Sequence, residues 1–205
     1  MTIAIIGTGS VGRALGVRLA GSGVPVVYGV RDPLKPRDGM PAVPIETVTS
    51  AVARAGIVIL AVPAVSVVAA ARDAGDLVGK IVIDCTNPVR FDGGPVWEPP
   101  AEGSMTAALA AACPGVAFVK GFNHFGAEIH ADPRVAGGPA DACFAGDDTR
   151  AKQAAMALAE RAGFRALDAG PLRNAAALEN LAVLWIQMAM TGAGRHVAFR
   201  LVGRV

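Results

Sequence analysis

The sequence predicts an α/β protein with a doubly wound, mostly parallel sheet and a short C-terminal helical addition. Short apolar runs rich in Val and Ile alternate with longer helix-like stretches through most of the chain. This alternation is typical of parallel strands joined by right-handed helical crossovers. The runs are continuously apolar, as expected for strands that helices cover on both faces. A glycine-rich turn between the first run and the first helix-like stretch is the third observation.

Each expected element follows from its local pattern. The predicted strands cover residues 3–6, 26–28, 57–62, 81–84, 116–120, 143–145 and 165–167. The predicted helices cover residues 11–20, 47–54, 106–112, 149–161 and 175–190. Asp148 is placed to cap the fourth helix, and Gly163 suits the left-handed position after its end. Two stretches rich in Gly and Pro, residues 92–103 and 131–140, are expected to be surface loops.

Composition and charge exclude several classes of protein. Hydrophobic residues make up 53% of the 205 residues and charged residues 18%, the opposite of a disordered chain's balance. The formal net charge of +2 comes without a basic stripe, so no nucleic-acid partner is expected. The longest uncharged stretch, residues 55–71, is interrupted by Pro63 and too short to cross a bilayer. No secretory signal precedes the first strand, which predicts a cytoplasmic protein with no membrane association.

The most informative segment is the turn after the first strand, where Gly7, Gly9 and Gly12 stand in the spacing G-x-G-x-x-G. The first glycine permits a tight turn, the second lets the backbone approach a pyrophosphate, and the third allows close helix–strand packing. Backbone amides at the start of the helix would then face the phosphate. The sequence therefore predicts a Rossmann-like dinucleotide site rather than a flexible turn without ligand. Its residues are Gly7, Thr8, Gly9, Ser10, Val11 and Gly12.

The end of the second strand indicates which dinucleotide binds. Sites that prefer NAD place an acidic residue there, about 20 residues after the glycine turn, to bind the ribose hydroxyls. Here Arg31 follows the strand and Lys35 comes soon after it. A guanidinium and a second cation suit a 2′-phosphate, so we expect a preference for NADP. Asp32, one residue further along the chain, could instead bind the ribose hydroxyls as the acidic residue of an NAD site does. Arg31 and Lys35 could also simply belong to a solvated loop.

Two further segments fall where such folds meet their cofactor, at the carboxyl ends of strands. An apolar strand end broken by proline could lie along the ribose and nicotinamide. A second segment carries an amide that could bond a ribose or a carboxamide. The predicted contacts are Ala61, Val62 and Pro63 in the first segment and Thr86, Asn87 and Pro88 in the second. The alternative interpretation is that these residues only mark where a strand ends and a loop begins.

With these residues assembled, the chain resembles the coenzyme F-420-dependent NADP oxidoreductase family, including its short bacterial members. The resemblance covers nearly the whole chain. It rests on residues 7–12 (GTGSVG), 29–31 (GVR) with Lys35, 60–63 (LAVP), 145–148 (AGDD), 167–172 (LDAGPL) and 178–181 (LENL).

The resemblance implies NADP held by the glycine turn, by Arg31 and Lys35, and by the loops at 61–63 and 86–88. It implies hydride exchange with a planar small-molecule acceptor such as the deazaflavin coenzyme F-420, and a homodimer. The segment 120–126 (KGFNHFG) looks different from that of F-420 users, so a flavin-like acceptor stays open. It also implies one domain over residues 1–205, with a dinucleotide-binding core at 1–145. Residues 146–205 would add a helix–strand–helix extension that completes the cleft.

Other polar residues are weaker candidates. His124 and Asn123 follow a strand at the binding edge, where His124 could donate to an oxyanion or steer a carboxamide, or simply pack among its aromatic neighbours. No spacing of His or Cys suggests a metal site. Glu179 lies on the last predicted helix, where solvent exposure is the default. On that helix Trp185, with other residues near its end, could stack on a ring.

Two alternative functions stay open. A non-catalytic module that senses NADPH would also explain the missing acid–base pair and the small size. A small NADPH-dependent reductase of another organic substrate, such as an imine or a pyrroline, would share the glycine turn. Those enzymes carry an all-helical second domain, and too few residues follow Leu172 to form one, although a dimer could complete the pocket.

Overall fold

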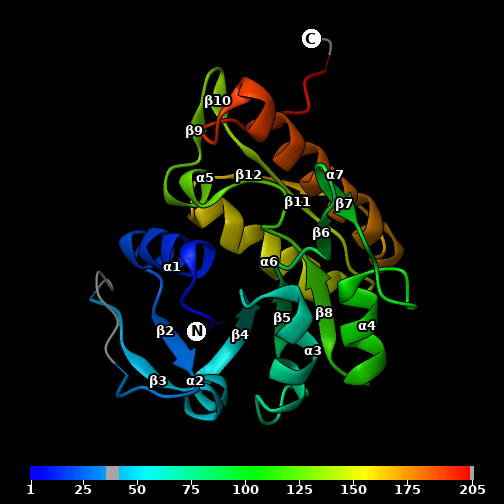
Figure 1. Ribbon diagram of the computed structural model, residues 1–205. Helices are drawn as coiled ribbons and strands as arrows, with labels where there is room; N and C mark the ends of the chain where they lie inside the picture. Colours follow the sequence, from blue (N-terminus) through cyan, green and yellow to red (C-terminus); the bar gives the residue numbers. More distant parts are fainter. Residues whose placement is uncertain (36–41, 204–205) are drawn as a thin grey trace.

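A computed structural model describes residues 1–35 and 42–203 of the chain. Its centre is a six-stranded sheet in which all neighbouring strands run parallel (Figure 1). The strands in spatial order are β3 (Ile45–Thr47), β2 (Val26–Val30), β1 (Thr2–Ile6), β4 (Ala55–Leu60), β5 (Ile81–Asp84) and β8 (Ala117–Lys120). The order reverses between β1 and β4, which is the topological switch point where doubly wound folds bind their ligands. The predicted Rossmann-like fold class is therefore confirmed.

Helices cover both faces of this sheet. One layer holds α1 (Ser10–Gly21), α5 (Ala127–Ala131) and α6 (Thr149–Arg161), and the other α2 (Val48–Arg54), α3 (Ala64–Arg72) and α4 (Met105–Ala112). Along β1, Ile3 and Ile5 pack into the first layer, while Ala4 and Ile6 pack into the second. This alternation explains why the strand sequences are apolar throughout, because each side chain meets a helix layer on its own face.

The chain beyond the sheet differs from the simple alternating pattern. The strands β11 (Asp141–Phe144) and β12 (Arg165–Asp168) form a separate parallel pair, which touches β8 through an antiparallel bridge between Lys120 and Ala145. The helix α7 (Ala175–Met188) follows a short 3-10 turn (Leu172–Asn174) and continues into a π-helical turn (Ala189–Ala193). One apolar core contains Leu15, Phe144 and Trp185 together, so residues from both sides of position 145 share it.

Both stretches expected to be loops contain short strands. The first stretch overlaps a hairpin of β6 (Val89–Phe91) and β7 (Pro95–Trp97), and the second contains β9 (Arg134–Val135) and β10 (Gly138–Pro139). The helices α3 and α5 were also not expected. An Ala- and Val-rich segment directly after Pro63 forms α3. Because this segment is apolar like the strand before it, its hydropathy did not indicate where the strand ends and the helix begins. The hairpin β6–β7 lies beside α7 (Figure 1).

Within the described part of the chain, no helix has the length and apolar character that crossing a bilayer requires.

Candidate cofactor-binding site

The glycine turn after β1 has a backbone that other residues could not easily replace. Gly7 adopts a φ of +110°, and a Cβ there would lie 2.4 Å from the carbonyl oxygen of Ala61. A Cβ on Gly12 would lie 2.2 Å from the carbonyl oxygen of Gly7. Gly9 is different, because no atom lies within 4 Å of the place its Cβ would take. Two glycines are thus required by packing, while Gly9 leaves an open space in front of α1.

The helix α1 begins at Ser10 with its first turn uncapped by any side chain. Its N-cap is Gly9, and its first turn carries no acidic residue. The amides of this turn therefore lack side-chain acceptors, and the helix dipole favours an anion at this end. Together with the open space at Gly9, the turn has the geometry of a phosphate cradle.

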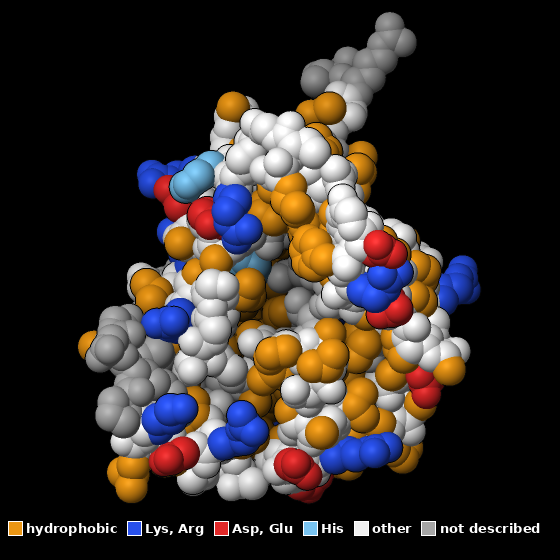
Figure 2. Space-filling model, in the orientation of Figure 1, with side chains coloured by type: hydrophobic (Ala, Val, Ile, Leu, Met, Phe, Trp, Pro, Cys, Tyr) orange, Lys and Arg blue, Asp and Glu red, His pale blue; other side chains and the backbone are white. Residues whose placement is uncertain are grey.

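A cavity of about 930 Å³ opens beside this turn. It lies between the carboxyl ends of β1 and β2 and the loop that leads from β4 into α3. Its walls are Ile6, Gly7, Thr8, Gly29, Val30, Arg31, Asp32, Lys35, Thr47, Val48, Thr49, Val62, Pro63, Val65, Ser66, Ala69, Ala70 and Asp73. Figure 2 shows a hollow near the centre of this face, bordered by hydrophobic side chains, with Lys and Arg side chains on its left and lower sides.

Arg31 and Lys35 both line the cavity and are exposed at its rim. Asp32 lines it as well, and its carboxylate accepts a hydrogen bond from the backbone N–H of Leu34 at 3.0 Å. The carboxylate therefore orders the loop that carries the two cations. The structure brings both predicted cations to the same cavity as Gly7 and Thr8.

The segments after β4 and β5 lie differently with respect to this cavity. Val62 and Pro63 form part of its wall, and Ala61 packs its backbone against Gly7. Thr86 and Pro88 are buried, and the Thr86 hydroxyl donates to a carboxylate oxygen of Asp84 at 2.7 Å. Gly9, Ser10, Val11, Gly12 and residues 86–88 are not among the walls of the cavity. The predicted residues thus form two groups, one around the cavity and one at the ends of β5 and β8.

Asn87 and Asn123 join the ends of these two strands. Asn123 Nδ2 donates to Asn87 Oδ1 at 2.8 Å, and Asn87 Nδ2 donates to the backbone oxygen of Asn123 at 2.8 Å. Asn123 Nδ2 also donates to the backbone oxygen of Leu178 in α7 at 2.9 Å. The side chain of Asn123 is thereby fixed between the sheet edge and the last helix.

His124 lies in the interior and does not face the cavity. The ring is 1% exposed, and its Nε2 lies 3.0 Å from the backbone oxygen of Asp141. Burial lowers the pKa of His124 to about 4, so the ring is neutral at pH 7. His130 is also buried and bonds the backbone oxygens of Gly126 and Phe122. Both rings are satisfied packing residues in this structure, and a catalytic role for His124 stays a prediction.

A buried charged cluster, consisting of Asp84, Lys120 and Glu179, was not expected. All three side chains are 0% exposed. Lys120 Nζ lies 2.9 Å from Asp84 Oδ2 and 2.9 Å from Glu179 Oε1, and it also donates to the backbone oxygen of Thr86. Burial opposes the charge on Lys120, but the two carboxylates hold the pKa of its ammonium above the usual value.

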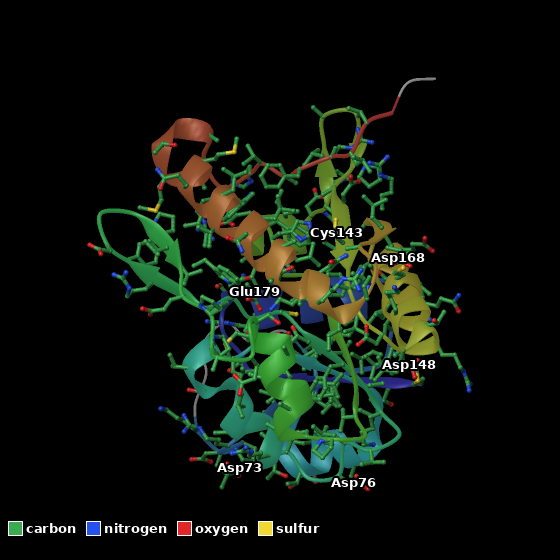
Figure 3. The ribbon with its side chains drawn as sticks, turned by 90° about the vertical axis from the view of Figure 1, so that its right-hand side faces the viewer. Asp73, Asp76, Cys143, Asp148, Asp168 and Glu179 are labelled. Atoms are coloured by element: carbon green, nitrogen blue, oxygen red, sulfur yellow. The ribbon has the colours of Figure 1, made fainter. Side chains whose placement is uncertain are left out.

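The expectation that Glu179 faces solvent is therefore wrong. Its carboxylate turns inward because Lys120, the backbone N–H of Met105 and the indole N–H of Trp97 all donate to it. Figure 3 shows Glu179 near the middle of the molecule, whereas Asp73 and Asp76 lie at its lower margin. A sequence signal for the cluster existed, since Asp84 and Lys120 are charged residues that end two continuously apolar strands.

Trp185 is likewise not available to stack on a ligand ring. Its side chain belongs to the buried core, and its indole N–H donates to the backbone oxygen of Val197 at 2.7 Å. The guanidinium of Arg195 covers the ring at 5.6 Å from its centroid. No group of three or more His, Cys, Asp or Glu side chains suited to a metal ion occurs among residues 1–35 and 42–203.

A phosphate-type glycine turn at the switch point of a doubly wound parallel sheet defines the class of Rossmann-type dinucleotide-binding proteins. Residues 2–88 match the family described as NADP oxidoreductase, coenzyme F-420-dependent. The predicted resemblance to that family is confirmed over this part of the chain.

Solved structures and curated proteins are similar to the chain over most of its length. A structure from Arthrobacter sp. FB24, described provisionally as an F-420-dependent NADP reductase, is 29% identical with a TM-score of 0.88, and the match covers 98% of this chain and 99% of that one. A hypothetical protein of Sinorhizobium meliloti is 29% identical with a TM-score of 0.72, over 100% of this chain and 96% of that one. The metalloreductase STEAP3 of Rattus norvegicus is 31% identical over 179 residues, which is 86% of this chain.

The chain spans about a third of the length of the curated relatives it matches, 35% in the case of the rat protein. The matching family and the Arthrobacter structure are both described as NADP-dependent oxidoreductases.

Proposed function

We propose that this protein binds NADPH and transfers hydride between its nicotinamide and a planar organic acceptor, of which the deazaflavin coenzyme F-420 is the first candidate. One observation carries the cofactor part of the proposal. Arg31 and Lys35 stand at the rim of the same cavity that Gly7 and Thr8 line. A phosphate cradle and two cations in one cavity suit a dinucleotide with an additional phosphate on its adenosine ribose.

The residues present fit such a cofactor. The open space at Gly9 and the uncapped first turn of α1 accept a pyrophosphate, and Arg31 with Lys35 would hold the 2′-phosphate. Thr47, Thr49, Val62 and Ala69 are among the walls of the cavity and offer methyl and aliphatic surface to a flat base. The bound nicotinamide would supply the hydride itself, and the protein binds, orients and excludes water.

Hydride transfer between two stacked rings does not require an acid–base pair from the protein. Such a step depends on close, aligned placement more than on proton transfer. The chain offers the half-buried Asn87 at the end of β5 to orient a ribose or carboxamide. Buried His124 and Thr86 contribute through the packing of that edge, since their polar atoms are engaged inside the protein.

The acceptor is the open part of the proposal. The Arthrobacter relative is described as acting with F-420, and the rat relative is named a metalloreductase. A purified sample should therefore be tested for NADPH oxidation at 340 nm with F-420, FMN, FAD and a ferric chelate. Turnover that requires F-420 supports the proposal. Turnover with the other acceptors alone would replace F-420, and tight NADPH binding without any turnover would favour a sensor.

The oligomeric state of the protein and its location in the cell are also proposals. The face of α7 and the turn after it expose Leu184, Met188 and Met190, which are 50%, 42% and 60% exposed. We propose that a homodimer covers this face. Light scattering on the wild-type protein and on Leu184→Glu tests it, since a dimer that uses this face should dissociate in the variant. A cytoplasmic location fits a protein that uses NADPH, and fractionation of the source cells tests it.

A further inference from the structure

The buried cluster of Asp84, Lys120 and Glu179 has a charge state that its hydrogen bonds define. Glu179 receives bonds from Lys120 Nζ, Met105 N and Trp97 Nε1, and none of these donors can act as an acceptor. The partners of Glu179 therefore suit a carboxylate and not a carboxylic acid.

Asp84 has four hydrogen-bond partners, which are two hydroxyls, one backbone N–H and one ammonium. Its Oδ1 receives the backbone N–H and the hydroxyl of Thr86 at 2.9 and 2.7 Å. Its Oδ2 receives the hydroxyl of Thr106 at 2.7 Å and Lys120 Nζ at 2.9 Å. Each carboxylate oxygen of Asp84 thus has a partner that can only donate, the backbone N–H of Thr86 or the ammonium of Lys120, which suits a carboxylate.

The cluster consequently carries a formal charge of −1. Lys120 is the single cation that forms an ion pair with the two carboxylates in the described part of the chain. Hydrogen bonds from neutral donors stabilise the surplus negative charge but do not cancel it. In a water-excluded interior, a charge acts over longer distances than it does at the surface.

The cluster lies directly under the loop at the end of β5. Lys120 donates to the backbone oxygen of Thr86, the first of the three loop residues expected to contact the nicotinamide half of the cofactor. The next residue, Asn87, is bonded to Asn123, which holds Leu178 of α7, the neighbour of Glu179. One connected set of bonds thus links the cluster to this loop and to α7.

We propose that the Asp84–Lys120–Glu179 cluster is a charge-setting and positioning device that makes the redox end of the site favour the oxidised, cationic nicotinamide over the reduced, neutral one. This inference rests on the proposed function, because it assumes that NADP(H) binds with its nicotinamide near residues 86–88. Oxidation of the ring adds one positive charge, so a nearby uncompensated negative charge stabilises the oxidised form selectively.

The test is the ratio of two dissociation constants, for NADP⁺ and for NADPH, measured by calorimetry without any acceptor. The wild-type protein is expected to bind NADP⁺ more tightly than NADPH. Glu179→Gln removes the charge and is best combined with Trp97→Phe. The glutamine has only one accepting oxygen, so it cannot accept from both the Trp97 indole and Lys120 as the carboxylate does. The single variant Trp97→Phe, which retains the charge, is the matched control.

In the double variant, the advantage of NADP⁺ over NADPH is expected to fall by about three- to tenfold relative to Trp97→Phe, the order of magnitude for one charge at such a site. Adding Lys120→Met restores the charge of −1 and should restore the ratio. An unchanged ratio in the folded double variant, checked by circular dichroism, would overturn the inference.

The wild-type measurement keeps the inference testable if the variants do not fold, because tighter binding of NADPH than of NADP⁺ contradicts it. Failure of the wild-type protein to bind either form would instead refute the proposed function.

Discussion

The side chain of Asn123 and the side chain of Asn87 bond each other across the ends of two parallel strands. Asn123 Nδ2 donates to Asn87 Oδ1, and the same nitrogen donates to the backbone oxygen of Leu178 in α7. Asn123 is 5% exposed, so water cannot easily replace these partners. One amide therefore ties the loop after β5, the loop after β8 and the last helix together at the edge where the cofactor is expected.

Removal of this amide is expected to destabilise the fold. Asn123→Ala removes the side-chain donor to Asn87 Oδ1 and the additional bond to the helical oxygen of Leu178, a loss of about 1–3 kcal/mol. Urea unfolding followed by circular dichroism measures the change. Asn180→Ala is the control, because that exposed amide bonds only within its own helix and its loss should cost about 0.5 kcal/mol or less. Equal costs in the two variants would mean that the link between the strand ends contributes nothing.

Arg31→Ala is expected to weaken NADPH binding by about 1.5–3 kcal/mol, the range for hydrogen bonds to charged groups. NADH binding should change little, because NADH lacks the 2′-phosphate that the guanidinium would hold. Calorimetric titration of both cofactors measures the difference. Arg161→Ala, at the exposed end of α6, should leave both affinities unchanged. Equal losses for NADPH and NADH in Arg31→Ala would remove the basis for the predicted specificity.

Gly9→Val and Gly7→Val are expected to fail in different ways. Nothing lies within 4 Å of a Cβ at Gly9, so the valine variant should fold normally and lose dinucleotide binding. A Cβ at Gly7 meets the oxygen of Ala61 at 2.4 Å and requires a φ of +110°, so Gly7→Val should destabilise the fold by about 2 kcal/mol or more. Thermal unfolding and cofactor titration distinguish the two. A Gly9→Val protein that still binds NADPH would show that the turn is only architectural.

Stability is expected to fall as the pH drops from about 6.5 to about 4. The unfolded state has His124 with its usual pKa near 6.5, while burial lowers the pKa to about 4 in the folded state. The unfolded state therefore binds more protons in this window, and the free energy of unfolding decreases by about 3 kcal/mol by pH 4. Above pH 6.5 His124 is neutral in both the folded and the unfolded state, so this loss of stability disappears.

Urea unfolding at a series of pH values, on the wild-type protein and on His124→Gln, isolates this contribution. Buried His130, whose pKa burial also lowers, remains in both proteins and cancels in the comparison. Parallel pH dependences for the two proteins would contradict the burial of a neutral His124.

Local sequence patterns predicted the central fold because each strand and helix there has a strong signal of its own. The helix at Thr149–Arg161 was predicted with its cap, since Asp148 accepts from the backbone N–H of Ala151 at 2.7 Å and Gly163 has a φ of +90°. The parallel pair β11–β12 was expected within a parallel sheet, but strand sequences do not encode which neighbour they pair with.

The candidate site likewise contains residues that local sequence patterns could predict and residues that they could not. The glycine turn and Arg31 could be found because spacing along the chain determines their chemistry. The Asp84–Lys120–Glu179 cluster could be found only in part. Asp84 and Lys120 are marked as charged ends of two apolar strands, but the members are 36 and 59 residues apart and only the tertiary fold brings them together. Glu179 in particular was expected in solvent, since no local pattern on α7 indicates that a lysine of β8 and an indole of β7 meet it there.

The most direct test of the central claim is a calorimetric titration of the wild-type protein with NADPH and with NADH under identical conditions. The cavity that joins the glycine turn to Arg31 and Lys35 predicts that NADPH binds at least tenfold more tightly. Tighter binding of NADH, or no binding of either dinucleotide, would contradict the assignment of this cavity to NADPH.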